Sequence, residues 1–138
     1  MEALDLPETA LNDLIGIPFE KDATGPEAYG CYGLCQEIQR WRGFFLPDHP
    51  TIESMEMRKA MLNRQPHRYC EPIERPEAYC LILFDMRTAG LHLGMVLPDT
   101  RYFIHSSQHR GRVRIEKLIG SLWERFLYGF YHCTCQCD

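Results

Sequence analysis

The stretch from Gly30 to Trp41 constrains the fold more than any other part of the sequence. Its apolar residues recur at three- and four-residue steps, which is typical of one buried face of an α-helix: Cys31, Leu34, Cys35, Ile38 and Trp41. The residues before it, 21–27, carry loop signals and no periodicity. Cys31 is therefore expected in the first turn of a buried helix, where unpaired backbone N–H groups and the helix dipole favour a thiolate.

Position alone leaves the role of this cysteine open. Most free cysteines are small buried hydrophobes, and by position Cys31 is better explained in that way. Cys35, one turn further on, is expected to be buried and inert. Gly33 is costly inside a helix and indicates that another backbone passes close by. The rest of the chain has to decide between a reactive and a structural Cys31.

Helices are expected in the first half of the chain and strands in the second. Besides the helix that begins at Cys31, the apolar spacing predicts helices over 8–15 and 51–63, with Thr51 as an N-cap. Three prolines, at positions 66, 72 and 76, mark an irregular connector. Strands are then predicted over 79–84, 91–97, 100–105, 112–115 and 128–133, with a short helix at most over 121–126. This order indicates an α+β fold with an antiparallel sheet.

Composition excludes several classes of protein. The 138 residues fit a single domain that spans 1–138, and 45% hydrophobic and 25% charged residues are ordinary for a globular protein. A net charge of -4 argues against nucleic-acid binding as the main task. No apolar run is as long as a membrane span, and the N-terminal residues lack the pattern of a signal peptide. The seven cysteines are therefore expected to be thiols in a reducing compartment.

Two histidines lie on strands that a turn at Pro98-Asp99 joins. A two-residue turn would place His92 directly opposite His105, whereas a four-residue loop would leave them as diagonal neighbours on the same face. In the directly opposite register the Cβ atoms would be roughly 4.5–5.5 Å apart, which lets one imidazole form a hydrogen bond with the other. Nucleophilic catalysis by a thiol needs a base, and the base needs a third group that orients it. Cys31, His92 and His105 supply these types in that order.

Two other clusters have competing explanations. The cysteines at 133, 135 and 137 are able to bind a soft metal in principle, but alternate residues of a strand cannot surround one ion, so a loose tail over 133–138 is expected. A basic patch lies beside His105 and consists of Arg110, Arg112, Arg114 and Lys117. It could bind the carboxylates of a peptide ligand, but we favour the alternative that it is only the solvated face of a strand.

Taken together, these motifs resemble the NlpC-type cysteine peptidases, and among them the bacteriophage tail branch. The matching segments, in chain order, are Gly16-Ile17-Pro18-Phe19, Gly30-Cys31-Tyr32-Gly33-Leu34, Gly43 to Pro47, His92-Leu93-Gly94-Met95-Val96, Phe103-Ile104-His105 and Gly129-Phe130-Tyr131. The resemblance runs from about Leu14 to Tyr131. It implies a reduced papain-like fold in which the cysteine helix packs on an antiparallel sheet.

The resemblance also implies a chemistry and roles for residues. Members of the family cleave peptidoglycan stem peptides, typically between D-glutamate and the diamino acid, through a thioester. By resemblance Cys31 is the nucleophile, His92 the general base and His105 the group that orients the base, with no metal or cofactor. Supporting or substrate-binding positions are Phe19, Gly30 and Tyr32. Two of these depart from the family, which commonly has Tyr in place of Phe19 and Asp in place of Gly30.

Partners and location follow from the same resemblance. Bacterial peptidoglycan and other phage tail-tip proteins are the expected partners. The protein is expected to be made in the bacterial cytoplasm and to act from a virion tail in the cell wall or periplasm. Two alternatives stay open: a structural tail-assembly protein with the same fold and no turnover, and an amidase or acyltransferase that acts on a small amide.

Overall fold

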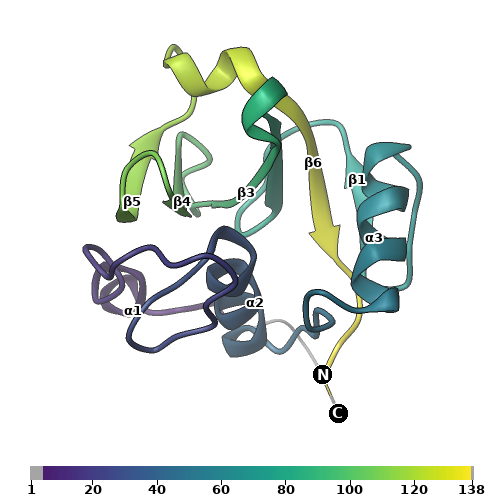
Figure 1. Ribbon diagram of the computed structural model, residues 1–138, viewed down its shortest axis with the longest axis horizontal. Helices are drawn as coiled ribbons and strands as arrows, with labels where there is room; N and C mark the ends of the chain where they lie inside the picture. The colour runs from purple at the N-terminus through teal and green to yellow at the C-terminus, as the bar shows by residue number, and fades with distance from the viewer. Residues whose placement is uncertain (1–4, 138) are drawn as a thin grey trace.

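Helices cover one face of a six-stranded sheet in the computed structural model, which describes residues 5–137 (Figure 1). The helices are α1 (Glu8–Asn12), α2 (Cys31–Trp41) and α3 (Ile52–Leu62). The strands are β1 (Cys70–Ile73), β2 (Leu81–Asp85), β3 (Leu91–Val96), β4 (Tyr102–Ser107), β5 (Arg112–Lys117) and β6 (Leu127–Cys133). They lie in the order β1-β6-β2-β3-β4-β5, every neighbouring pair being antiparallel, with short 3-10 turns at Arg87–Ala89 and Leu122–Phe126. The predicted mixture of helices and an antiparallel sheet is confirmed.

The apolar stripe of α2 forms the centre of the core. Leu34, Cys35 and Ile38 are fully buried and belong to one cluster with sheet residues from the facing strands: Leu81, Leu83, Leu93, Met95 and Ile104. Each large aliphatic side chain buried in this way contributes roughly 1.5–3 kcal/mol to stability. Trp41, at the last turn, is only partly buried. The strongest sequence pattern therefore marks the element on which both the loop before it and the sheet pack.

The close backbone approach expected at Gly33 is confirmed. A Cβ atom built at Gly33 would overlap the carbonyl oxygen of Ala23, which belongs to the loop before α2. The same oxygen accepts a hydrogen bond from the backbone N–H of Gly30 at 2.9 Å. The loop is thus fixed directly against the first turn of α2, where Cys31 lies.

The predicted ends of the other two helices agree with the structure to different degrees. Thr51 caps α3 as predicted, in a capping box with Ser54. α1 ends at Asn12, earlier than the predicted residue 15, because the next residues bond to β5: Gly16 N–H donates to the carbonyl of Val113, and Val113 N–H to that of Ile17. α2 and α3 have 11 residues each, and no helix within residues 5–137 is long and apolar enough to cross a membrane.

One strand lies where the sequence predicts an irregular connector. Cys70–Ile73 pairs with β6 even though it contains Pro72, which lies opposite Tyr131. β1 is at the edge of the sheet, so a proline there does not interrupt a ladder on both sides. The neighbouring prolines at 66 and 76 masked this short strand in the sequence.

The expected loose tail requires a correction. The backbone N–H of Thr134 donates to the carbonyl of Tyr69 at 3.0 Å, and that of Phe45 donates to the carbonyl of Cys135 at 2.7 Å. Cys137 N–H donates to the carbonyl of Gly43 at 2.8 Å. Residues 133–137 are held because the chain after α2 offers backbone partners, while residue 138 lies outside the described residues.

Gly33→Ala should destabilise the protein, because the added methyl group meets backbone rather than a side chain that can move away. We expect the free energy of unfolding in urea to fall by about 2 kcal/mol or more, in the upper range of single substitutions. Arg40→Ala, on the exposed last turn of the same helix, is the matched control and should change stability little. An unchanged unfolding midpoint for Gly33→Ala would contradict the close approach.

Candidate functional site

The loop that joins β3 and β4 sets the register of the two histidines. Leu97 N–H donates to the carbonyl of Tyr102, which leaves four residues in the loop and pairs Met95 with Ile104. The two-residue turn is therefore wrong, and the four-residue alternative holds. Proline cannot take the positive φ that a tight primed turn requires at its first position. Instead Thr100 has a φ of 61°, and the Asp99 carboxylate accepts backbone hydrogen bonds from Arg101 and Tyr102.

His92 and His105 are joined directly despite this shift. Nε2 of His92 lies 2.7 Å from Nδ1 of His105, a hydrogen bond between diagonal neighbours on the same face. His105 is fully buried and His92 is 8% exposed. A Cβ atom at Gly94 would lie 3.3 Å from the Cβ of His105, so glycine keeps this part of β3 clear beside the ring. The structure thus brings together the two histidines that the sequence singles out.

A carboxylate that the sequence analysis did not single out completes this arrangement. Oε2 of Glu116 lies 2.6 Å from Nε2 of His105. Oε1 of Glu116 accepts hydrogen bonds from Arg110 at 2.9 Å and from the indole of Trp123 at 3.2 Å. The sequence pattern ended the strand at Ile115, whereas β5 continues to Lys117. A predicted strand two residues longer would have included Glu116 and placed its carboxylate on a strand next to that of His105.

Aromatic rings enclose the histidine pair on the side of the sheet away from α2. The ring of Trp123 lies 4.7 Å from that of His105 and 5.6 Å from that of His92, and Phe84 stacks on His92 at 5.8 Å. Burial, together with the neighbouring His105, lowers the pKa of His92 to about 3, although Glu116 opposes this. Burial also lowers the pKa of His105, although Glu116 opposes this. Both rings are therefore neutral near pH 7.

Cys31 lies at the start of α2, as the sequence predicts, and shares a cleft with His92. The cleft has a volume of about 150 Å³ and is also lined by Leu91 and Leu93, whose strand packs on α2. His105 does not reach it. Among residues 5–137 no hydrogen bond joins Cys31 to His92. Both residues line the cleft, but the His92 ring contacts Phe84 and Trp123 on the sheet face away from α2.

The expected thiolate is the second correction. Burial raises the pKa of the Cys31 thiol, and hydrogen bonds from the backbone of Leu93, Tyr32 and Cys31 itself only partly offset this. The N–H groups of the helix start do point toward the sulfur, as the sequence predicts. Desolvation outweighs them because the half-buried side chain has little water around it. In the free protein Cys31 is a thiol.

A second cleft, of about 200 Å³, lies on the loop side of Cys31. The supporting residues that the resemblance singles out all line it: Phe19, Gly30 and Tyr32. His49, which the sequence analysis did not single out, lines both clefts, and its ring lies 5.6 Å from that of Tyr32. No periodic pattern surrounds His49, which lies in the loop before α3. Cys31 therefore lies between two clefts that meet at its side chain.

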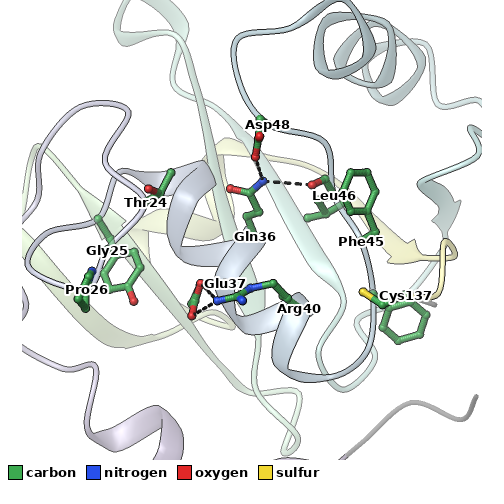
Figure 2. Close-up of a pocket in the computed structure, with 12 residues that line it drawn as sticks. Thr24, Gly25, Pro26, Gln36, Glu37, Arg40, Phe45, Leu46, Asp48 and Cys137 are labelled. Carbon is green, nitrogen blue, oxygen red and sulfur yellow. Dashed lines mark hydrogen bonds and ion pairs between the residues drawn. The ribbon is translucent and has the colours of Figure 1, made fainter.

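A larger cleft along α2 does not include these groups. It has a volume of about 550 Å³ and lies beside the later turns of the helix (Figure 2). Its polar side chains satisfy one another: the Gln36 amide donates to Asp48, and Arg40 pairs with Glu37. Neither Cys31 nor a histidine lines it. Size alone therefore does not identify the candidate site.

The remaining cysteines do not form a metal centre in the described part of the chain. Within residues 5–137 no group of three or more His, Cys, Asp or Glu residues is arranged to hold a metal ion. Cys35, Cys70 and Cys80 are buried. Burial raises the pKa of each of these thiols above the ordinary cysteine value. Cys35 is thus buried, as the sequence predicts.

Comparison with known proteins places the fold but not the activity. No protein-family model and no curated protein sequence matches the chain. The solved structure of NlpC2 from Trichomonas vaginalis is similar, with a TM-score of 0.63 and 18% sequence identity over 88% of this chain. The similarity covers 44% of that protein, so this chain spans less than half of its length. The chain has an NlpC-like fold.

The buried neutral histidines should make the protein less stable in acid. In the unfolded chain they bind protons below about pH 6.5, whereas the folded protein resists protonation down to much lower pH, so stability is fully present above pH 6.5 and is lost as the pH falls toward 3. Each histidine contributes a slope of up to about 1.4 kcal/mol per pH unit in this window. Urea unfolding at several pH values between 7.5 and 4 measures it. His92→Gln should make the dependence shallower, and a stability that is constant down to pH 4 would contradict the burial of neutral rings.

Proposed function

We propose that this protein is an NlpC-type cysteine peptidase that cleaves an amide bond of peptidoglycan stem peptides, between D-glutamate and the diamino acid. The observation that carries the proposal is the shared cleft of Cys31 and His92, with His92 hydrogen-bonded to His105 behind it. A nucleophile, a base and a group that orients the base are the three parts of this chemistry. The NlpC-like fold supports the same assignment.

The reaction begins with proton transfer from Cys31 to His92. The sulfur then attacks the carbonyl carbon of the scissile amide, forming the C–S bond and a tetrahedral intermediate. The backbone N–H groups at the start of α2 face the sulfur and are suited to stabilise the negative oxygen of this intermediate. Because burial disfavours an isolated charge on either group, thiolate and imidazolium form together rather than separately.

Collapse of the intermediate breaks the C–N bond and leaves a thioester on Cys31. Protonated His92 gives its proton to the leaving amine. A water molecule, deprotonated by His92, then attacks the thioester carbonyl, releases the carboxylic acid and returns the proton to the thiol. Thiol and base lie on the same cleft without a hydrogen bond, and catalytic groups of free enzymes commonly reach their working distance only with substrate bound.

The two clefts fit a peptide that passes over Cys31. One cleft includes Arg58, and the other includes Lys21 next to the carboxylate of Asp22, so a cationic side chain is present on each side of the sulfur. Stem peptides carry free carboxylates on both sides of the D-glutamyl bond, and these cations suit such groups. Each cleft is small, at about 150 and 200 Å³, which favours a short peptide over a folded protein substrate.

We place this activity in a phage or prophage tail, where the protein would act on the cell wall together with other tail-tip proteins. A structural tail-assembly protein is the second candidate. Two observations favour it: Cys31 is a protonated thiol without a bond to His92, and Gly30 and Phe19 replace side chains common in the family. The two candidates differ in whether purified protein turns over a stem peptide.

Substitutions in the three groups should separate a working site from a structural one. Cys31→Ala should abolish the release of free amine from purified muropeptides, because no other group forms the thioester. His92→Ala should be nearly as severe, since such residues act as a unit. His105→Asn should be milder, because an amide can still accept a hydrogen bond from the His92 ring. Release of the new amine, followed by chromatography, measures all three.

Cys137→Ala is the matched control, because this half-buried cysteine lies outside both clefts that meet at Cys31. It should keep wild-type activity. Cleavage that survives Cys31→Ala would exclude the mechanism. A wild-type protein that cleaves no muropeptide from several wall chemistries, alone or in an assembled tail, would favour the structural candidate.

A further inference from the structure

We infer that Glu116 is a positioning residue that sets the proton arrangement of both histidines, so that Nδ1 of His92 is left unprotonated. The inference rests on the proposed function for its catalytic consequence. The proton arrangement itself follows from hydrogen bonds alone and has its own measurement.

Glu116 is held as a carboxylate by three donors. Arg110 donates to both of its oxygens, at 2.9 and 3.2 Å, and the Trp123 indole donates to Oε1 at 3.2 Å. His105 lies 2.6 Å from Oε2. Burial raises the pKa of Glu116, but the hydrogen bonds from Arg110, His105 and Trp123 together bring it below its ordinary value. The side chain is thus ionised and can only accept hydrogen bonds.

The position of each ring proton follows from this acceptor. Nε2 of His105 must carry a hydrogen, because its partner is a carboxylate. A neutral imidazole has one N–H, so Nδ1 of His105 is an acceptor and Nε2 of His92 must donate to it across 2.7 Å. His92 is also neutral, which leaves the lone pair on its Nδ1. With both rings neutral, only one arrangement of protons satisfies every member of this chain.

The arrangement matters because the opposite tautomer of His92 has no lone pair at Nδ1. With a hydrogen there, the ring cannot take the proton of Cys31. The enclosure by Trp123 and Phe84 leaves His105 fully buried, so water cannot substitute for the carboxylate. When His92 becomes an imidazolium, the negative charge behind His105 also stabilises it. Arg110 and Trp123 together help to hold that carboxylate in place.

Glu116→Gln tests the inference because glutamine has nearly the same size and shape as glutamate but carries no charge. Arg110 and Trp123 both donate to the Oε1 position, so the glutamine oxygen is expected there and its NH₂ group faces Nε2 of His105. That ring nitrogen must then accept, and both histidines change tautomer. The ¹⁵N shifts of the histidine rings should show Nε2–H in the wild type and Nδ1–H in the variant. Peptidase activity should fall on the order of 100-fold, within the usual range for loss of a general base.

Two variants make the result specific. Glu71→Gln removes an exposed carboxylate from β1 and should change neither the tautomers nor the rate. Arg110→Gln keeps the carboxylate, so the wild-type tautomers should persist. Protonation of Nδ1 of His92 in the wild-type protein would overturn the inference even if Glu116→Gln does not fold.

The proposed function and this inference can fail separately. Tautomers that change in Glu116→Gln, in a wild-type protein without peptidase activity, would support the inference and remove the proposed function. Tautomers and rate that stay unchanged in Glu116→Gln, in an active protein, would overturn the inference and leave the peptidase intact.

Discussion

The contact between the Ala23 carbonyl and the first turn of α2 fixes the geometry on which the candidate site depends. It determines how close the loop before Cys31 lies to the helix, and Gly33 is the residue that permits it. The loop is tied in turn to the sheet, because the hydroxyl of Ser106 donates to the carbonyl of Tyr29 at 2.7 Å. Ser106 follows His105 directly on β4. The backbone approach at Gly33 and the hydrogen bond of Ser106 therefore link the helix of Cys31 to the strand of His105.

Cys31 and His92 belong to different layers of the molecule, the helix α2 and the sheet, although both line one cleft. Leu91 and Leu93 face α2 and pack in the core cluster of Cys35, whereas His92 between them contacts Phe84 and Trp123 on the other face. Such an arrangement places the base in an apolar, water-poor setting and leaves the thiol at the surface of the core. The ring of His92 gains a fixed orientation, and Cys31 lines two clefts.

Much of this arrangement follows from the sequence, since it depends on local periodicity. The stripe of α2, the cap at Thr51 and the change from helices to strands are all short-range patterns, and the structure has each of them. What the sequence does not predict depends on long-range pairing. β1 exists because β6 provides a partner for an edge segment with a proline, and residues 134–137 are held by the backbone near Gly43 and Tyr69.

At the candidate site, too, the features that follow from local sequence patterns are predicted and those that depend on long-range packing are not. Residue type and spacing single out Cys31, His92 and His105. The hairpin brings the two histidines together, whereas Cys31 comes near His92 through the packing of α2 on β3. Glu116 and His49 are missed because β5 continues past its apolar pattern and the loop before α3 has no pattern at all. The protonation of Cys31 is missed for a different reason: dipole and N–H groups are visible in a sequence, whereas the amount of water left around a side chain is not.

Desolvation also explains why the base needs a chain of partners rather than one. A neutral imidazole in an apolar enclosure has two tautomers of similar energy, and one hydrogen bond to another neutral imidazole does not choose between them, since either ring can donate. A choice requires a group that only accepts, and the chain ends at one in Glu116. Its charge would be costly in the same enclosure without Arg110, which is itself less buried and closer to water. The chain from His92 through His105 to Glu116 and Arg110 thus keeps the buried rings neutral and places the charged groups nearer to solvent. The carboxylate at its end still determines which nitrogen of His92 carries the proton.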